Sequence, residues 1–340
     1  MTETFRPDYD LQSKNSLAVS SKCRWFVSVK DEQQLFSAVV FARENRLPLV
    51  VLGSGTNVVL ADYLDALVAE IRIPGKYVIS RDAESAMVEV GGGENWHQFV
   101  IWCLEQKLYG LENLALIPGT CGAAPIQNIG AYGVELSELL DSVEIFDIGE
   151  QKLKRFSRAE CELSYRDSIF KNELQNRVVV VSIRLRLRCI HKSNLGYPAL
   201  TDYLELNQLE STPNNVFDAV CAIRRSKLPD PDEIPNAGSF FKNPIIPQAH
   251  ADRLRKQYSD MPGFPLVEGK EKITAAWLID KAGWKGSEHR GVGVHDKQAL
   301  VLINPGRRNA KGILELADKI SADVLTKFGV QLELEPRVID

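Results

Sequence analysis

The chain has 340 residues, is 44% hydrophobic and 25% charged, and carries a formal net charge of −4. This composition is typical of a globular protein with two or three domains, and the lack of a basic run argues against a nucleic-acid-binding surface. No stretch is apolar over the ~18 residues that a membrane span needs, and the polar, acidic residues 1–14 do not resemble a signal peptide. We therefore expect a cytoplasmic protein with no nucleic-acid partner and no membrane insertion, and we expect a monomer.

The N-terminal part of the sequence predicts a β-α-β unit that ends at a glycine turn. Residues 25–29 ("WFVSV") read as a strand, and residues 47–52 ("LPLVVL") read as a buried strand. Between them, the helix expected over 31–46 has an apolar face formed by Leu35, Phe36, Val39 and Val40. The second strand leads directly into "GSGTN" (53–57).

Two more glycine-rich segments follow apolar elements. A strand expected at 86–90 runs into "GGG" (91–93). The helix after it carries apolar residues at i, i+3, i+4, i+7 and i+8, namely Trp96, Phe99, Val100, Cys103 and Leu104. Residues 117–133 ("IPGTCGAAPIQNIGAYG") contain four glycines and no charged side chain.

The remainder of the chain mixes strands and helices. Strands are expected at 142–148, 152–157, 177–188 and 299–304, and helices from Thr212-Pro213 onward and over 309–328. In the third of these strands Ile183, Leu185 and Leu187 alternate with arginines, which predicts one buried and one solvated face. The tail from Val330 alternates in the same way.

The three glycine loops together indicate a cofactor site. Glycine lets backbone N–H groups approach a ligand without cationic side chains. No lysine follows the glycine of "GSGTN" as in a Walker loop, and no loop reads G-x-G-x-x-G, which argues against a kinase and against a standard dinucleotide-binding fold. A tight turn explains "GGG" when it is taken alone. A large, flat, uncharged ligand such as a flavin explains all three loops, since it needs small side chains and no charge to desolvate.

No metal site is expected from the cysteines or the histidines. The six cysteines are scattered singly without a C-x-x-C pair, and the five histidines show no ligand spacing. We read the cysteines as reduced thiols. Cys121 has no adjacent histidine or cation that would activate it, so we interpret it as a small residue in a crowded loop.

Three polar residues are candidates for chemistry, and each has a structural alternative. Arg166 in "SYRDSIF" (164–170) keeps its proton and would stabilise an oxyanion, although spacing alone favours a surface ion pair. Ser239 in "NAGSFFKNP" either donates a proton from a buried site or caps a turn. Glu335 lies on the polar face of the tail, where a carboxylate is usually solvated.

The motifs together resemble the UDP-N-acetylenolpyruvoylglucosamine reductase (MurB) family. The matching pieces include "LGSGTN", "GGGENWH", "PIQNIGAYGVE", "YRDSIFK", "KLPDP", "NAGSFFKNP" and "LEPRV". They run in the expected order from residue 47 to residue 338, nearly the whole chain. "NLGYPAL", which carries Tyr197, is similar to the mobile tyrosine loop of the longer, type I members.

The resemblance implies an α+β chain. Its FAD-binding fold, of the vanillyl-alcohol-oxidase/PCMH type, is built from two α/β subdomains, and a third α+β domain binds substrate. FAD-binding subdomain 1 is expected at 1–74 plus 329–340, subdomain 2 at 75–215, and the substrate-binding domain at 216–328. By motif, the expected flavin contacts are Gly53, Ser54, Gly55, Thr56, Asn57, Gly119, Thr120, Gly122, Ala123, Ile126, Gly130 and Ala131.

The resemblance also implies the reaction. NADPH reduces FAD and leaves, and UDP-N-acetylglucosamine enolpyruvate then enters the same site and is reduced to UDP-N-acetylmuramate. Ser239 matches the proton donor at C2, and Arg166 and Glu335 match the pair that stabilises the enol-like intermediate. The positions that match those binding the UDP part are Tyr132, Tyr197, Lys227 and Asn243. "KGSEHRG" (285–291) departs from the family pattern and leaves Glu288 without an assigned role.

Two other functions stay open from the sequence. One is an oxygen-using flavin oxidase of the same fold, for which Cys121 is the only tempting residue to tether a flavin. The other is a non-catalytic module that binds a flavin or a nucleotide sugar and has no need for Glu335. Ser239, Arg166 and Glu335, all in family context, favour the reductase over both.

Overall fold

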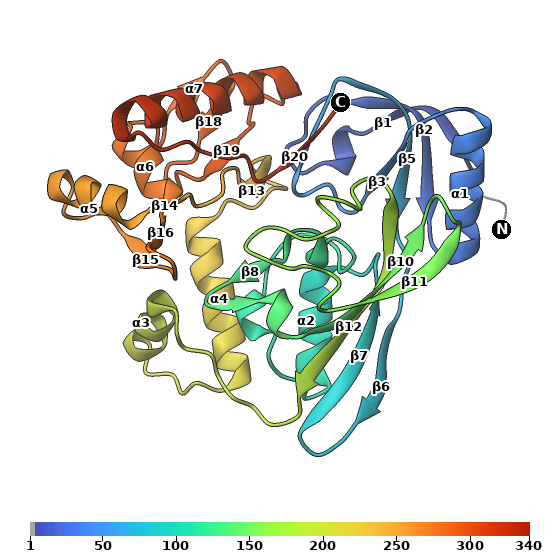
Figure 1. The fold of residues 1–340 in the computed structure, drawn as a ribbon, viewed down its shortest axis with the longest axis horizontal. Coiled ribbons are helices and arrows are strands. Elements are labelled where there is room, and N and C mark those ends of the chain that lie inside the picture. The colour runs from blue at the N-terminus through green and yellow to red at the C-terminus, as the bar shows by residue number, and fades with distance from the viewer. Residues whose placement is uncertain (1–3) are drawn as a thin grey trace. The chain divides into compact units, whose positions relative to one another are not determined.

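The computed structural model describes residues 4–340, which group into two compact units (Figure 1). Unit 1 contains the chain up to Tyr9, Cys23–Ser54 and Asp65–Ser226, and unit 2 contains Asp10–Lys22, Gly55–Leu64 and Lys227–Asp340. The border between the units therefore falls inside "GSGTN", after Ser54. The three-domain division implied by the resemblance remains a prediction.

Unit 1 contains a four-stranded sheet in the order β1-β2-β5-β3, with bounds Arg6–Asp10, Lys22–Val29, Tyr63–Ile71 and Leu49–Leu52. Helix α1 (Glu32–Glu44) begins after Asp31, whose carboxylate accepts the N–H of Gln34 over 2.8 Å and so caps the helix. The predicted strand, helix and strand are all present.

The buried face of α1 differs from the prediction at Phe36 and at Val40, which is only half-buried. The buried residues are Leu35, Ala38, Val39 and Ala42. Phe36 was expected inside but is 45% exposed. Successive helical residues are about 100° apart, so Phe36 lies outside the stripe that Leu35 begins.

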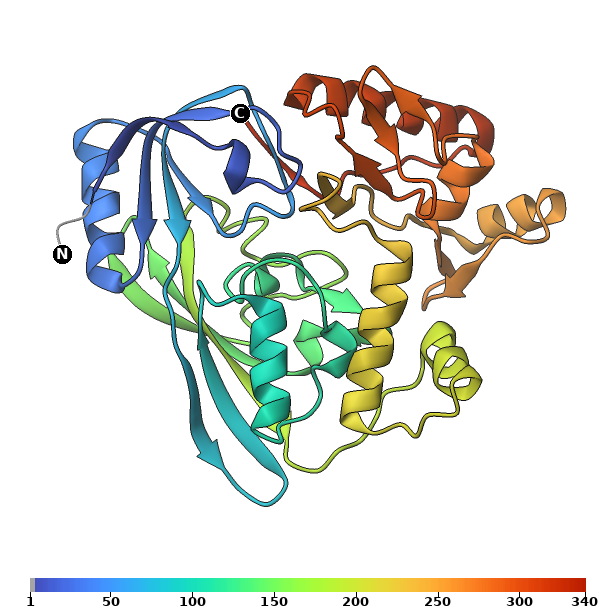
Figure 2. The same ribbon diagram turned by 180° about the vertical axis from the view of Figure 1, so that it is seen from behind.

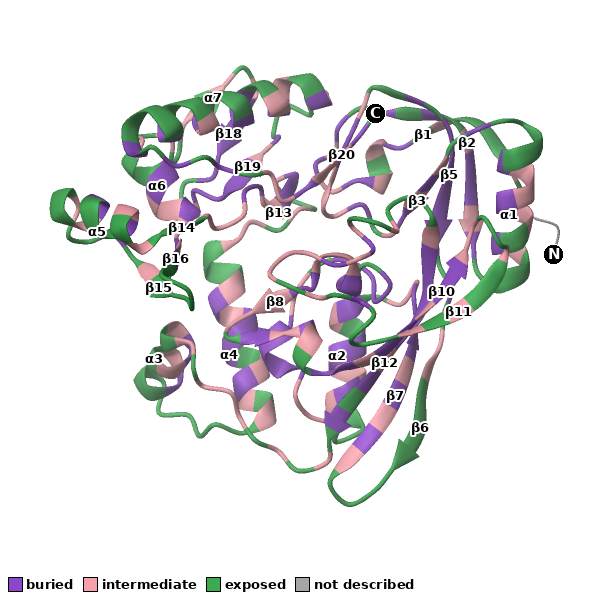
Figure 3. Ribbon diagram, viewed as in Figure 1, coloured by how far each residue is buried: buried purple, intermediate pink, exposed green. Residues whose placement is uncertain are grey.

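The second sheet of unit 1 has five strands in the order β11-β10-β12-β7-β6 and is antiparallel throughout. Their bounds are Lys152–Ser157, Leu140–Asp147, Val178–Arg188, Ser85–Gly91 and Lys76–Arg81. The alternation predicted for β12 is confirmed: Leu185 and Leu187 are buried, whereas Arg184 places its Nε 2.6 Å from the carboxylate of Glu89. The edge strand β6 is mostly exposed (Figure 3).

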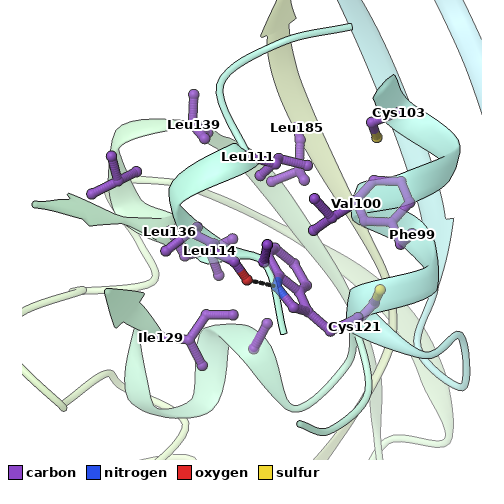
Figure 4. Close-up of a cluster of buried hydrophobic side chains, with 14 of the residues drawn as sticks. Phe99, Val100, Cys103, Leu111, Leu114, Cys121, Ile129, Leu136, Leu139 and Leu185 are labelled. Carbon is purple, nitrogen blue, oxygen red and sulfur yellow. Dashed lines mark hydrogen bonds between the residues drawn. The ribbon is translucent and has the colours of Figure 1, made fainter. Parts of the chain in front are cut away.

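The core of unit 1 packs helices α2 (Trp96–Glu105), α3 (Pro198–Leu206) and α4 (Pro213–Lys227) with residues of this sheet (Figures 1 and 2). Four of the five apolar residues predicted on α2 are buried, and Leu104 is half-buried. In the buried cluster of Figure 4 the indole N–H of Trp96 donates to the carbonyl of Leu114 over 2.9 Å. This bond fixes the 3₁₀ turn η2 (Glu112–Leu114) to the core.

Unit 2 contains a four-stranded sheet, a three-stranded sheet and the strand pair β20-β4 that is described with the tail below. The first has the order β13-β19-β18-β17, with bounds Asn236–Ser239, Val301–Ile303, Val292–Val294 and Glu288–His289. The second has the order β14-β16-β15, with bounds Ile245–Pro247, Lys270–Ile273 and Gly263–Pro265. The helices are η1 (Gln12–Lys14), α5 (Gln248–Gln257), α6 (Ala275–Lys281) and α7 (Ala310–Phe328). Helix α7 is the one predicted at 309–328, begun by Asn309 and ended by Gly329 in the left-handed conformation.

The tail is less regular than its alternation predicts. Val330 and Leu332 are buried as expected, but the strand β20 covers only Arg337–Ile339. Pro336 has no N–H to contribute to a ladder, which is consistent with a strand that begins after it. β20 pairs in parallel with β4 (Val58–Leu60), the strand that directly follows "GSGTN".

Within residues 4–340, no helix combines the length and the apolar character needed to cross a membrane, and no group of histidine, cysteine and acidic side chains is suited to hold a metal ion. All six cysteines are free thiols.

Candidate active site

Within unit 1, the start of "GSGTN" (53–57) and the "GGG" loop (91–93) both contact the glycine-rich 117–133 segment. A Cβ placed on Gly53 would lie 2.8 Å from Thr120 Oγ1, and a Cβ on Gly122 would lie 2.9 Å from the Cα of Gly92. The N–H of Gly122 also donates to the carbonyl of Gly92 over 2.9 Å. A side chain at Gly122 would push the two backbones apart, so glycine is required there, whereas at Gly53 the nearest group is the rotatable Thr120 side chain.

The surface made by these loops suits a flat, neutral ligand. Gly53 is half-buried and Ser54 is exposed, while the 117–133 segment contributes Gly119, Thr120, Gly122, Ala123, Ile126, Gly130 and Ala131. Ala123 is exposed, and Ile126, Gly130 and Ala131 are half-buried, so small side chains and backbone face outward there. The residues therefore fit the flavin that the sequence predicts.

The rest of "GSGTN" belongs to unit 2. Gly55 has φ +65°, and a Cβ there would collide with the carbonyl of Lys14, so only glycine fits. Thr56 and Asn57 are half-buried, and the Asn57 side-chain amide donates to the backbone carbonyl of Glu335 over 3.4 Å.

The 117–133 segment ends in a tight hairpin that carries Tyr132. The short strands β8 (Gly130–Ala131) and β9 (Val134–Glu135) pair across a two-residue turn. Tyr132 and Gly133 have φ of +49° and +82°, as a type I′ turn requires. Asparagine or glycine normally fills the first of these positions, so the tyrosine is held in a strained conformation.

Arg166 also lies at a strained turn. Ser164 and Asp167 exchange two backbone hydrogen bonds of 3.1 and 3.2 Å, and Tyr165 and Arg166 form the turn between them. Arg166 has φ +55°, a conformation that favours glycine or asparagine. Its guanidinium carbon lies 5.4 Å from the centre of the Tyr165 ring.

Three side-chain hydrogen bonds dock the Arg166 turn on the glycine-rich segment. Arg166 Nη2 donates to the carbonyl of Gly130 over 3.1 Å, and the Ser168 hydroxyl donates to the carbonyl of Ile126 over 2.6 Å. The buried Asn128 donates to the carbonyl of Ser164 over 3.1 Å. The structure therefore brings the predicted cation, Arg166, to the predicted flavin-binding segment.

A second arginine, Arg224 on α4, lies in the same part of unit 1. Its Nε is buried and has no hydrogen-bond partner among the described residues. Burial lowers the pKa of Arg224, and the nearby positive charge of Arg166 acts in the same direction. Burial likewise raises the pKa of Tyr132, and the Arg224 charge opposes that rise. The ring of Tyr132 meets that of Tyr197 edge-on, with 5.1 Å between centroids.

Unit 2 brings Ser239 and Glu335 onto neighbouring segments. Ser239 is the last residue of β13 and directly follows Gly238, which has φ +68°. The N–H of Gly238 donates to the side-chain oxygen of Asn236 over 2.9 Å, and this bond closes a turn just before the serine. The N–H of Glu335 donates to the carbonyl of Phe240, the residue after Ser239, over 3.0 Å. The backbone of Glu335 is therefore bonded to the residue that follows Ser239 in the chain.

The remaining predicted binding residues lie elsewhere in their elements. Lys227 is the exposed last residue of α4, three positions after Arg224. Asn243 uses its side-chain oxygen to accept the N–H of Ala275 over 3.0 Å at the start of α6. This bond gives Asn243 a structural task that its sequence motif does not indicate.

Cys121 lacks the properties of a reactive thiol. It is fully buried, and burial raises the pKa of its thiol well above the ordinary value. The thiol therefore stays protonated, which supports its interpretation as a small packing residue.

Comparison with known proteins decides the family. Residues 230–339 match the C-terminal domain of UDP-N-acetylenolpyruvoylglucosamine reductase, and residues 24–157 match an FAD binding domain. The UDP-N-acetylenolpyruvoylglucosamine reductase of Burkholderia multivorans (strain ATCC 17616 / 249) is 45% identical over 333 residues, which are 97% of this chain and 95% of the relative. The chain belongs to the UDP-N-acetylenolpyruvoylglucosamine reductase family.

Other members support the same family. The UDP-N-acetylenolpyruvoylglucosamine reductase of Pseudomonas aeruginosa is 44% identical over 329 residues, 96% of this chain and 97% of its own. The crystal structure of the reductase from Thermus caldophilus, at 22% identity, shares the fold with a TM-score of 0.67 over 100% of both chains. The predicted family and the α+β, FAD-binding fold are confirmed. This reductase is an FAD-binding oxidoreductase of peptidoglycan precursor synthesis.

Sequence reasoning missed two residues of this site, Asn128 and Arg224. Asn128 falls in the quoted motif "PIQNIGAYG", but its role depends on φ +45° and on a distant turn that only the fold brings near. Arg224 stands in "AIRRSKLPDP" beside Arg225, and the sequence gives no sign of which of the two is buried.

Proposed function

We propose that this reductase uses NADPH to reduce UDP-N-acetylglucosamine enolpyruvate to UDP-N-acetylmuramate, with both molecules occupying one site in turn. The observation that carries the proposal is the docking of the Arg166 turn on residues 126–130, which joins a fixed positive charge to the segment suited to flavin. The chemistry that bound FAD supplies is hydride transfer, accepted from NADPH and delivered from N5 to C3 of the enolpyruvyl group.

Arg166 stabilises the negative charge that develops on the substrate. Hydride addition at C3 places charge on C2 and the adjoining carboxylate, and a guanidinium keeps its own proton throughout. The strained turn fixes where that charge lies, so little reorganisation is needed during the reaction. Glu335 acts with Arg166 at the same intermediate.

Ser239 donates the proton that completes the reduction at C2. It is half-buried and follows a glycine with positive φ, so its backbone position is set by the Asn236 turn. A proton donor must lie within hydrogen-bond reach of the atom that it protonates, so its position matters as well as its pKa. The hydrogen bond from the N–H of Glu335 to the carbonyl of Phe240 restrains the backbone next to Ser239.

The UDP part is bound by Tyr132, Tyr197, Lys227 and Asn243, and we add Arg224 to this set. The buried Nε of Arg224 has no hydrogen-bond partner among the described residues, which is costly unless an anion completes it, and the substrate carries a diphosphate and a carboxylate. Arg224 and Lys227 are three residues apart on α4, a spacing that makes their side chains neighbours on the helix surface.

The flavin contacts in this proposal are the residues of "GSGTN" and of the 119–131 segment named above. They support FAD through backbone N–H groups and small side chains. The protonated, buried Cys121 gives no support to a covalently tethered flavin, so the oxygen-using oxidase is less favoured. We further propose that the enzyme works as a monomer in the cytoplasm, where its charged nucleotide substrates are dissolved.

An anaerobic two-step titration of the purified enzyme tests this proposal. NADPH should bleach the yellow flavin, and the enolpyruvyl sugar nucleotide should then restore the colour without oxygen. Recovery of colour only when oxygen is admitted would favour the oxidase instead. A protein that denaturation shows to contain no FAD would overturn the proposal.

A further inference from the structure

The buried side chain of Asn113 joins two segments that carry tyrosines. Asn113 lies in η2 and is 2% exposed. Its side-chain amide donates to the carbonyl of Tyr132 over 2.8 Å and to the carbonyl of Asn194 over 2.9 Å. One amide group therefore links the type I′ hairpin to the loop that leads into Tyr197.

A second set of bonds runs alongside the first. The Asn194 side-chain amide donates to the carbonyl of Gly133 over 3.2 Å, and Asn194 Oδ1 accepts the N–H of Gly196 over 3.1 Å. The loop bonded in this way brings the Tyr197 ring against that of Tyr132.

Asn113 is the fixed partner in this arrangement. The residues on either side of it, Glu112 and Leu114, are buried, and Leu114 accepts the hydrogen bond from Trp96 in the core. Residues 190–196, in contrast, have no regular secondary structure, and none of them is fully buried. Elsewhere the loop is held by the Ser193 hydroxyl, which donates to the carbonyl of Ser211 over 2.6 Å, by the Thr201 hydroxyl, which donates to the carbonyl of Leu195 over 2.9 Å, and by the packing of Leu195 on the core. Loss of the Asn113 bonds therefore releases the part of the loop that faces the Tyr132 hairpin.

We propose that Asn113 is a positioning residue that holds the Tyr197 loop closed on the Tyr132 hairpin and thereby sets the affinity for the sugar nucleotide. The inference rests on the proposed role of the two tyrosines in binding the UDP part. Both hydrogen bonds of the Asn113 amide go to backbone carbonyls, so it acts through the segments that carry the tyrosines. When the closed loop is less populated, the apparent affinity falls by that fraction.

Steady-state kinetics of Asn113→Leu test the proposal. The substitution keeps the side-chain volume and removes both donors. We expect KM for the enolpyruvyl sugar nucleotide to rise about tenfold, kcat to change less than twofold, and FAD content to stay the same. Backbone amides of residues 195–197 should exchange with solvent faster. An unchanged KM, or a loss confined to kcat, would overturn the inference.

Asn304→Leu is the matched control. Asn304 is also buried and also donates to two carbonyls, those of Leu17 and Arg308, over 2.8 and 2.9 Å in unit 2. Asn304 Oδ1 also accepts the N–H of Arg308 over 2.7 Å, so Asn304→Leu should lower the melting temperature at least as much as Asn113→Leu does, without a tenfold rise in KM. An equal rise in KM would show that Asn113 has only a general structural role.

Two further variants separate failure of this inference from failure of the proposed function. Tyr197→Ala alone should raise KM, and Asn113→Leu should add nothing to it. If Tyr197→Ala leaves KM unchanged, the binding role proposed for the tyrosine is wrong. If it raises KM while Asn113→Leu does not, only the positioning role is wrong. Should Asn113→Leu fail to fold, Asn194→Asp removes one bond at the surface and should raise KM severalfold. An unchanged KM in Asn194→Asp would count against the positioning role.

Discussion

Glu335 donates its backbone N–H to the carbonyl oxygen of Phe240 over 3.0 Å. The bond joins the tail of the chain to the residue after Ser239, although nearly a hundred residues separate them in sequence. The Asn57 amide meets the backbone carbonyl of the same glutamate, and both contacts use main-chain atoms of Glu335. The side chain of Glu335 can therefore be changed while its backbone remains fixed by both bonds.

Glu335→Gln should separate catalysis from folding. The backbone contacts remain, so the melting temperature should change by no more than about 2 °C. Reduction of the enolpyruvyl sugar nucleotide should slow on the order of 100-fold, because the carboxylate is lost from the proposed intermediate-stabilising pair. The control is Glu333→Gln, which removes only an exposed ion pair with Lys242. Equal activity of both variants would exclude a catalytic role for Glu335.

Arg166→Asn should cost activity but little stability. Asparagine tolerates φ +55° better than arginine does, and this gain offsets the lost bond to Gly130. We expect the free energy of unfolding to change by less than about 1 kcal/mol, while single-turnover reduction of substrate falls by about 10²–10³. The control is Gln151→Asn, which introduces asparagine at another residue with positive φ and should leave the activity unaffected. Full activity of Arg166→Asn would remove Arg166 from the mechanism.

Arg224→Met should make the substrate-free protein no less stable. Burial disfavours the charged form of Arg224, whose Nε has no partner among the described residues, and methionine fills most of the space, so the free energy of unfolding should stay equal or rise by about 1–3 kcal/mol. KM for the sugar nucleotide should rise at least tenfold if Arg224 meets an anion. Arg225→Met changes the neighbouring exposed arginine and should alter neither quantity. A large loss of stability with unchanged KM would contradict the proposed binding role.

His97 predicts a loss of stability in mild acid. Its Nδ1 accepts the N–H of Leu116 over 3.0 Å, its ring stacks on Phe217, and burial together with Arg225 and Arg224 lowers its pKa. The folded protein therefore favours the neutral ring of His97. Its contribution to the free energy of unfolding is fully present above the unfolded-state pKa of about 6.5, and it is lost as the pH falls through the lowered pKa of the folded state. Chemical denaturation between pH 8 and pH 5 should show this slope, and His97→Gln should flatten it. An unchanged slope in the variant would assign the pH dependence to other groups.

The sequence predicts best those features that depend on local pattern. Helix α7 lies where the apolar periodicity of residues 309–328 predicts it, and β12 alternates as expected. Features that depend on distant contacts are harder. The hairpin at Tyr132 lacks the asparagine that normally marks a type I′ turn, and the exposure of Phe36 depends on which stripe of α1 meets the sheet. Arg224 could not be singled out, because a buried Nε without a hydrogen-bond partner is a property of the folded interior.

Separate measurement of the two half-reactions in Ser239→Ala tests the central claim most directly. Without oxygen, NADPH should reduce the flavin of the variant at close to the normal rate, because no substrate proton is needed for that step. Reoxidation of the flavin by the enolpyruvyl sugar nucleotide should slow by about 10²–10⁴, the usual contribution of a positioned proton donor. The same substitution at the half-buried Ser137 of η4 (Leu136–Glu138) provides a comparison that should change neither rate. Equal slowing of both half-reactions in Ser239→Ala, or no slowing of either, would contradict the account.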